Sequence, residues 1–271
     1  MSGRGPLRCQ GAGGALPCGP TLRRPPVRGR SPPPGAGDKS ARTGRYAGPL
    51  RAAVNRGSIA GMVVDLSHPI ENGMPVYPDD PVPRLADVPT APPWKLTSVT
   101  LGSHSGTHID AASHYIPGGK TIDRYPLERF VLPGVVVRVR GLAGAVPIAW
   151  GRVAGQLPTD VRGLAAVLDT GWASHWGSER YFVHPYLSEE TCRELVAAGV
   201  SLVGTDAPSV DDTAGGSRHA HQSLLGEDVL IVENLANLER LTPGRVYRFA
   251  FAPLPLIGVD GSPVRAFAWE Q

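Results

Sequence analysis

Residues 103–114 read Ser103-His104-Ser105-Gly106-Thr107-His108-Ile109-Asp110-Ala111-Ala112-Ser113-His114. They follow a stretch, residues 95–101, in which β-branched and polar residues alternate as they do in a strand. His104 and His108 are four residues apart, so either a helical turn or a tight turn at Gly106 can point both imidazoles the same way. Imidazole and carboxylate ligands together suit zinc, manganese or iron. The spacing therefore predicts a metal site that includes Asp110.

A second polar cluster lies further along the chain. Glu233 follows an apolar run, residues 229–232, which predicts a carboxylate at the end of a buried strand, where an unpaired charge is costly. A metal ion is a natural partner for Glu233, and an arginine or a helix N-terminus is the alternative. His219 and His221 compete for one ligand role, and sequence periodicity does not choose between them.

The remaining pattern predicts an α/β fold with a mixed parallel and antiparallel sheet. Ser188 should cap a helix that runs to Ala198 and ends at Gly199. Eight prolines between residues 69 and 93 predict a long loop. Loops after strand ends carry the chemistry in such folds. Besides residues 95–101, strands are expected at residues 62–66, 134–139, 164–168, 201–204, 229–232, 245–251 and 264–269.

Charge divides the chain into two parts. Residues 1–61 contain 11 basic residues and one acid, with Tyr46 as the one aromatic residue, whereas residues 62–271 contain 16 basic and 23 acidic residues. The first part has the composition of a disordered tail or a dispensable extension, with a functional basic arm or a targeting leader as alternatives. Nucleic acid is not an expected partner, because no aromatic residues interleave the arginines to stack bases. We expect one functional domain at residues 62–271.

The sequence does not indicate a membrane-bound or a disulfide-bonded secreted protein. No stretch approaches 18 uninterrupted apolar residues, so neither a transmembrane helix nor a membrane partner is expected. Three cysteines provide no disulfide framework. We therefore expect a cytoplasmic protein with reduced thiols.

The chain resembles the metal-dependent cyclase-type hydrolases, the family that contains bacterial kynurenine formamidases and isatin hydrolases. The resemblance covers roughly residues 62–271 and is carried mainly by the His-x-Gly-Thr-His-x-Asp element at residues 104–110. Supporting matches are Val64-Asp65-Leu66-Ser67-His68-Pro69, Met74-Pro75-Val76-Tyr77-Pro78, Asp169-Thr170-Gly171-Trp172, the segment 204–211 and Glu233-Asn234-Leu235. The resemblance implies a swivelling β/β/α-type fold.

The resemblance also implies a role for each matching residue. His104, His108 and Asp110 would bind one metal ion, and Asp110 would bridge to a second. The second ion would also be held by His221 and Glu233, since the family's twelve-residue separation fits His221 better than His219. His114 would be the catalytic acid and base. The expected cofactor is Zn²⁺ or Mn²⁺, with two ions per subunit.

Two residues depart from the family pattern. Ala112 stands where the family usually has proline, which should loosen the backbone that aims His114. Asp79 adds an acid beside Asp80 near the expected substrate entrance. The second departure affects the choice of substrate, while both leave every expected ligand in place.

The expected reaction is hydrolysis of an amide, lactam or related carbonyl bond by metal-activated water. The alternatives are a lactone or isatin-type hydrolase, a polyketide-cyclase-like biosynthetic enzyme and a metal-binding homologue without turnover. The substrate should be a small aromatic or cyclic amide, and a homodimer or homotetramer is the expected assembly. Candidate substrate contacts are Trp94, Trp172, Thr107 and Ser209.

Overall fold

The computed structural model describes residues 63–270, and residues 1–62 and 271 lie outside the described part. The predicted disordered tail at residues 1–61, together with its basic-arm and leader alternatives, falls outside the described residues.

One mixed sheet organises the fold. Its strands follow the order β1-β12-β11-β5-β7-β9-β10-β4, and β4 also pairs with β12, so that seven strands close into a ring. Strands β5, β7, β9 and β10 run parallel, and the other pairings are antiparallel. The predicted mixed α/β fold is confirmed. The strands are β1 (Val64–Asp65), β4 (His108–Asp110), β5 (Val131–Arg138), β7 (Ala165–Asp169), β9 (Leu202–Thr205), β10 (Leu230–Glu233), β11 (Val246–Pro253) and β12 (Gly261–Trp269).

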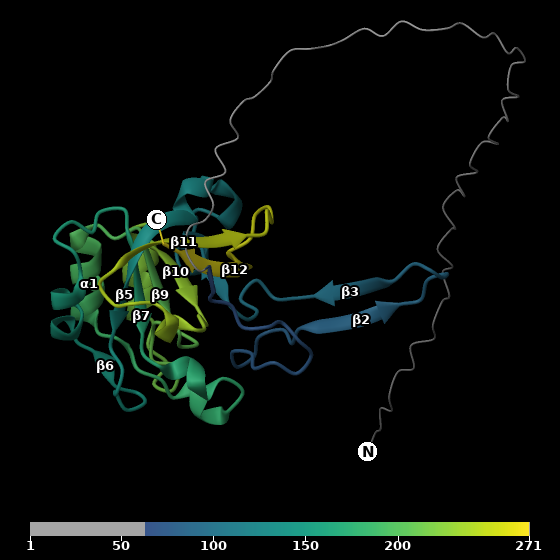
Figure 1. Cartoon of the computed structure of the whole chain (residues 1–271), viewed down its shortest axis with the longest axis horizontal. Coiled ribbons are helices and arrows are strands. Elements are labelled where there is room, and N and C mark those ends of the chain that lie inside the picture. Colours follow the sequence, from purple (N-terminus) through teal and green to yellow (C-terminus); the bar gives the residue numbers. More distant parts are fainter. Residues whose placement is uncertain (1–62, 271) are drawn as a thin grey trace, which may run out of the picture. The chain divides into compact units, whose positions relative to one another are not determined.

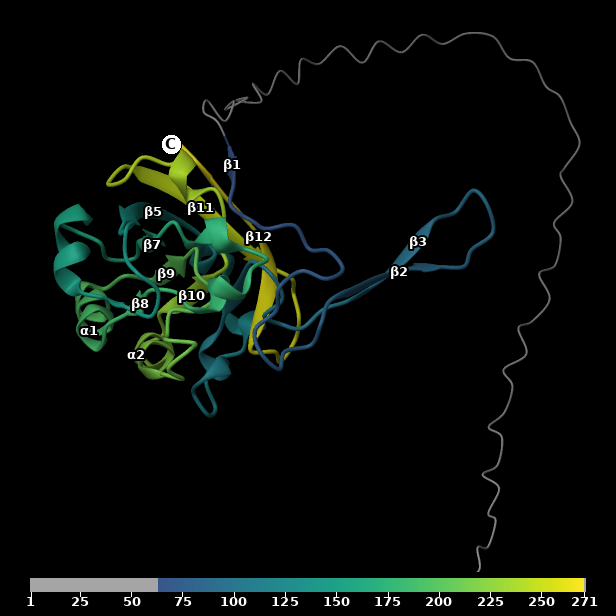
Figure 2. The same cartoon turned by 90° about the horizontal axis from the view of Figure 1, so that it is seen from below.

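Side chains that alternate along the strands form two cores. In β5, Val136 belongs to one apolar cluster, whereas its neighbours Val135 and Val137 belong to another. The second cluster includes Leu195 of α1 (Glu189–Ala198) and Leu224 of α2 (His219–Gly226). Both helices therefore cover the same face of the sheet, as Figure 2 shows.

Helix α1 has the predicted ends. The Ser188 hydroxyl accepts a hydrogen bond from the Thr191 amide, and Gly199 has a left-handed φ of 81°. All the expected strands are present, with ends shifted by up to three residues.

The predicted loop at residues 69–93 is wrong in part, because it contains β2 (Arg84–Val88). Strand β2 pairs only with β3 (Leu96–Thr100), and Pro83 and Pro89 flank it, so no proline interrupts the ladder. This hairpin extends from the body of the fold (Figures 1 and 2). All five residues of β3 are exposed. A smaller pairing joins β6 (Pro147–Ile148) and β8 (Tyr186–Leu187).

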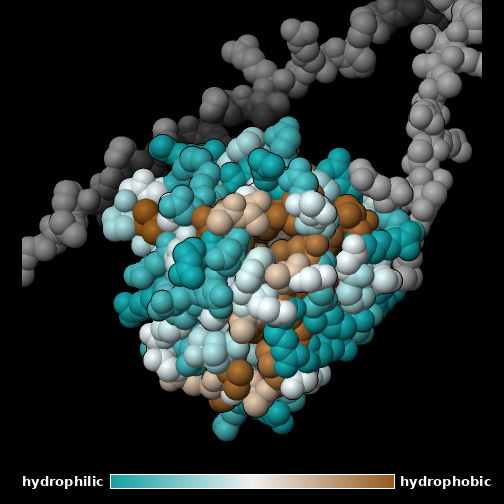
Figure 3. All heavy atoms as spheres, turned by 90° about the vertical axis from the view of Figure 1, so that its left-hand side faces the viewer, coloured by the Kyte–Doolittle hydropathy of each residue, from teal (hydrophilic) through white to brown (hydrophobic). Residues whose placement is uncertain are grey.

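The surface away from the hairpin shows apolar residues between hydrophilic ones (Figure 3). Across residues 63–270, no helix has the length and apolar character needed to cross a membrane.

Candidate metal centre

The turn before β4 brings two histidines together. Gly106 has a φ of 65°, a left-handed conformation that favours glycine, so the chain reverses between His104 and His108. The two imidazole centroids lie 5.0 Å apart. Of the two geometries expected for this spacing, the structure has the glycine turn.

Strand register brings the carboxylates to the same place. His108 and Asp110 are two residues apart in β4, so their side chains point to one face of the strand. Glu233 of β10 is the direct cross-strand partner of His108. The His108 Nε2 lies 3.3 Å from Asp110 Oδ1 and 3.5 Å from Glu233 Oε2.

Helix α2 supplies a further imidazole to this group. The Nε2 of His221 lies 3.5 Å from Asp110 Oδ2 and 3.4 Å from Glu233 Oε1. The neighbouring His219 faces elsewhere, with its Nε2 2.7 Å from the Leu187 carbonyl oxygen. The structure thus brings His221, and not His219, to the carboxylates.

Hydrogen bonds to the other ring nitrogens orient these imidazoles. The Nδ1 of His108 donates to the Gly106 carbonyl oxygen at 2.8 Å. The Nδ1 of His221 donates to Asp211 Oδ2 at 2.7 Å. Each contact leaves Nε2 directed toward the carboxylates, which is how metal-binding histidines are usually held.

These residues fit a metal ion. Asp110 Oδ2 is buried without a hydrogen-bond partner, and such an orphaned carboxylate oxygen is costly unless a cation lies beside it. Two groups of possible ligand atoms share Asp110: one includes His104 and His114, the other His108 and Glu233. Imidazole nitrogens and carboxylate oxygens are a donor set for zinc or manganese.

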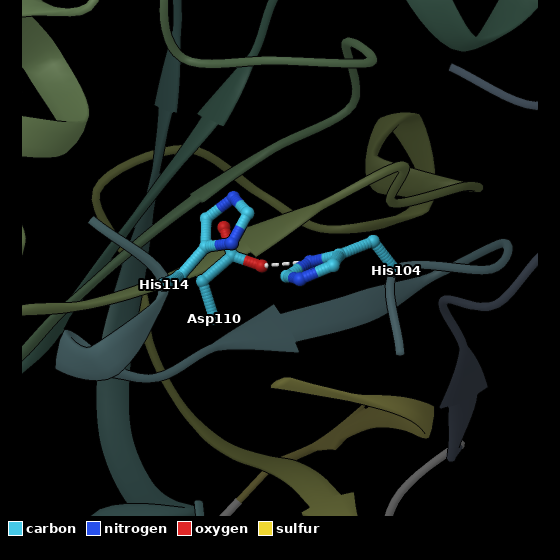
Figure 4. A group of neighbouring side chains, drawn as sticks. All are labelled: His104, Asp110 and His114. Carbon is cyan, nitrogen blue, oxygen red and sulfur yellow. Dashed lines mark hydrogen bonds and ion pairs between the residues drawn. The ribbon is translucent and has the colours of Figure 1, made fainter. Parts of the chain in front are cut away.

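Figure 4 shows His104, Asp110 and His114 pointing toward one another, with the Asp110 carboxylate hydrogen-bonded to His104. The His104 Nδ1 lies 2.8 Å from Asp110 Oδ1. The two Asp110 oxygens therefore face different imidazoles, with Oδ1 near His104 and His108 and Oδ2 near His221.

Without metal, the carboxylates hold protons on these histidines. Burial alone would lower the pKa of His108, but the buried Asp110 charge outweighs it and raises that pKa to about 10. The same opposition raises the pKa of His104 to about 9. The carboxylates of Asp110, Asp211 and Glu233 likewise raise the pKa of His221 well above its usual value.

Metal binding should consequently release protons. A metal ligand must be a neutral imidazole, so we expect full loading at pH 7.5 to release roughly three protons per chain. The apparent affinity should rise as pH increases toward the raised pKa values, and should level off above them. Titration calorimetry in two buffers of different ionisation enthalpy measures the number. Release of less than one proton per chain would contradict this charge state.

Asp211 is a residue of this site that the sequence did not single out. Besides its contact with His221, it accepts hydrogen bonds from the backbone amides of Ala220 and His221, at the start of α2. Asp211 therefore caps the N-terminus of α2 and also orients the imidazole of His221, which this helix carries. The sequence signals were its place at the end of the matching segment 204–211 and its position eight residues before a short helix.

Replacing Asp211 should weaken metal binding. We expect Asp211→Ala to reduce metal affinity about 10–100-fold, as loss of a partner to a liganding histidine does. It should also destabilise the fold by about 1 kcal/mol through the lost helix cap. Chelator competition and thermal unfolding measure the two effects. Ser188→Ala is the matched control, because it removes the cap of α1 without touching the site, and equal metal loss in both variants would contradict the assignment.

His114 follows β4 on a short 3₁₀ turn, Ala112–His114, that also holds the first departure from the family pattern. The Ala112 amide donates to the Tyr125 hydroxyl at 3.3 Å, a bond that proline could not make. The hydrogen bond from Ala112 to Tyr125 therefore restrains the backbone at residue 112, where the absence of proline was expected to loosen it. The His114 Nδ1 lies 3.1 Å from Asp260 Oδ2.

A cavity of about 240 Å³ opens beside these residues. His104, His108, His114, His221 and Glu233 line it together with Ser209, a predicted substrate contact. Aromatic side chains form much of the remaining wall, which suits a small flat molecule. They are Tyr77, Tyr115, Trp176, Tyr181 and Phe182.

The other three predicted substrate contacts are not among the residues that line this cavity in the single chain. Trp94 is 76% exposed in the segment joining β2 and β3. Trp172 is buried and donates its indole N–H to the Tyr181 carbonyl oxygen. Thr107 is buried and donates to the Asn234 carbonyl oxygen. Trp176, which the sequence did not single out, lines the cavity and stacks on His68 with ring centroids 3.9 Å apart.

Asp79 and Asp80 differ in position. Asp80 lines the cavity, whereas the additional acid Asp79 is exposed and has a φ of 71°. An aspartate tolerates this left-handed conformation better than most residues.

Known proteins resemble this chain over most of the described part. A family model described as "Putative cyclase" matches residues 64–212. Kynurenine formamidase of Bordetella avium is 31% identical over 210 residues, covering 76% of this chain and 97% of that protein. The structure of a predicted metal-dependent hydrolase from Bacillus stearothermophilus has 27% identity and a TM-score of 0.67, covering 78% of this chain and 100% of that one. Isatin hydrolase A of Labrenzia aggregata, 24% identical over 80% of this chain and 97% of that one, shares the fold with a TM-score of 0.69.

Proposed function

Because the chain belongs to the Cyclase family, we propose that it is a metal-dependent hydrolase of a non-peptide carbon–nitrogen bond in a small aromatic formamide or cyclic amide. The resemblance recognised in the sequence is confirmed. The observation that carries the proposal is an aromatic-lined cavity whose wall contains four histidines and Glu233, with Asp110 within ion-pair distance of three of these histidines.

The contacts within the site suggest a separate role for the metal ion, for His114 and for the aromatic wall. A bound metal ion would polarise the substrate carbonyl and supply hydroxide at neutral pH. His114 has its Nδ1 engaged by Asp260, so Nε2 is the nitrogen available to protonate the leaving nitrogen. Trp176 and Phe182 would hold the substrate ring against the cavity wall.

The proposed ligands are His104, His108, Asp110, His221 and Glu233, with two Zn²⁺ or Mn²⁺ ions per chain. The two Asp110 oxygens face different imidazoles, which supports a bridging role. Elemental analysis of the saturated protein tests the number. One equivalent per chain would reject the bridged pair and would leave a single-site hydrolase.

Substrates can be separated with a small panel. N-formylkynurenine, isatin and small lactones should be assayed with the zinc-loaded and the manganese-loaded protein, and turnover of the formamide is expected. The name of the Bordetella relative supports the formamide, and the cavity volume suits any member of the panel. Absence of turnover with either metal, together with tight binding of one aromatic compound, would instead indicate a non-enzymatic binding protein.

We propose a homodimer in which the β2–β3 hairpin packs on a second copy of the chain. A two-stranded hairpin is marginal by itself, and this one exposes Trp94, Leu96 and Val99. Those side chains would be covered by a partner. Light scattering should give two chains per particle, and Val99→Lys should shift the protein toward monomer. A wild-type monomer would reject the proposal.

The proposed location is the cytosol. Cys192, the cysteine of the described part, is buried and free, and burial raises the pKa of its thiol to about 12. Such a thiol is unreactive and is compatible with a reducing compartment. Fractionation of the native host would test the location.

A further inference from the structure

We propose that Asp260 is a positioning residue that orients two imidazoles of the site at once, one on the metal side and one on the proton-transfer side. Its consequence for turnover rests on the function proposed above. Its effects on His104 and His114 can be measured without any substrate.

The backbone of Asp260 is fixed to the strand that carries the ligands. Its carbonyl oxygen accepts a hydrogen bond from the Ala111 amide at 2.8 Å. The next residue, Gly261, pairs with Asp110 at the start of β12. The carboxylate therefore starts from a point set by β4, although it is 156 residues from His104 in the chain.

One carboxylate oxygen meets both imidazoles. Asp260 Oδ2 accepts from His104 Nε2 at 3.0 Å and from His114 Nδ1 at 3.1 Å. Asp260 thus contacts the Nε2 of His104 but the Nδ1 of His114. The contact leaves Nδ1 of His104 facing Asp110 and Nε2 of His114 available to a substrate. A carboxylate that selects a tautomer in this way is a recurring requirement in proton transfer by histidine.

Close packing adds to the orientation of His104. A Cβ at Gly261 would lie 2.8 Å from His104 Cε1 and 2.7 Å from the Ile109 carbonyl oxygen. His104 therefore packs directly on the backbone beside Asp260, and only glycine leaves room for it. The rings of His104 and His114 are 4.0 Å apart, so a displacement of one would disturb the other.

The Asp260 side chain is 40% exposed, so the acid is not explained by burial against a structural cation. Among residues 63–270, its ion-pair partners are the two histidines of the site. A partly exposed acid whose ion pairs are both with histidines of the cavity wall is suited to orienting them.

The test uses Asp260→Asn, which keeps the shape of the side chain and removes the charge. In nitrogen-15 spectra of the metal-free wild type, His114 should be in one tautomer, with its proton on Nδ1. In metal-free Asp260→Asn, the same spectra should show a mixture of the two tautomers. Chelator competition should show metal affinity about 10–100-fold lower. In the loaded enzyme, kcat should fall about 100-fold while KM changes less than about threefold, and Asp260→Glu should recover about tenfold of the loss.

Asp123→Ala is the matched control. Asp123 Oδ1 accepts from the Gly258 amide and so anchors the same loop without contacting either imidazole. It should leave the tautomer, the metal affinity and kcat within about twofold of wild type. Equal losses in both variants, or an unchanged tautomer and affinity in Asp260→Asn, would overturn the proposal. Absence of wild-type turnover on the whole panel would reject the proposed function, while the spectra and metal affinity would still decide the role of Asp260.

Discussion

His114→Ala is expected to lower kcat by about 10²–10⁴-fold, the usual effect of losing a positioned acid or base, while the metal content stays unchanged. His114 lines the cavity and keeps Nε2 available, and its Nδ1 is engaged by Asp260. It is not a member of the ligand group formed by His108, Asp110 and Glu233, although it lies in a second group with His104 and the shared Asp110. Steady-state kinetics combined with elemental analysis of the same sample measures both quantities.

The same variant decides between two roles for His114. One of its nitrogens lies within 4.8 Å of ligand atoms of His104 and Asp110, so the geometry also permits metal ligation. Loss of metal in His114→Ala would therefore assign it to the ligands and would remove the proposed acid. His175→Ala is a suitable control, because His175 contacts Trp172 and does not line the cavity.

His108→Ala should lower metal affinity more than His114→Ala does. Its Nε2 lies between Asp110 and Glu233, so its removal should lower metal affinity by more than about 100-fold, beyond the effect of losing an outer partner. The metal-free protein should also lose stability, by about 3–5 kcal/mol, because two buried carboxylates lose a cationic neighbour. Elemental analysis and denaturant unfolding measure these losses.

His219→Ala is the control for this experiment. It removes a histidine of the same helix as His221 whose Nε2 faces the Leu187 carbonyl oxygen. Because the His219 Nδ1 lies 3.6 Å from Asp211 Oδ1, a small loss of metal affinity is expected, far below that of His108→Ala. If His108→Ala retains a full complement of metal, His108 is not a ligand.

Local signals predicted much of the fold. Helix α1 could be read because a serine cap and a terminal glycine mark its ends, and both act through neighbouring residues. Strand β2 was missed because prolines dominate its surroundings, although Pro83 and Pro89 lie just outside it. Helix α2 was missed because its amides are capped by Asp211, through a contact that is visible only in three dimensions.

The site divides in the same way. The dense segment 104–114 contains three of its histidines, so the motif could be read directly from the sequence. The cavity wall could not, since nothing local distinguishes Trp176, which faces the cavity, from buried Trp172. Asp260 could not be predicted as a site residue, because its contacts with the histidines depend on the pairing of β4 with β12.

That pairing has a consequence for the order of events in the cell. The ligands of β4 are flanked by β10 and β12, and both strands are synthesised more than a hundred residues later. Contacts between such distant segments form late, because a long loop must close first. A nascent chain can therefore display His104, His108 and Asp110 well before it can enclose them. We expect stable metal capture only after β12 has been synthesised and has paired with β4.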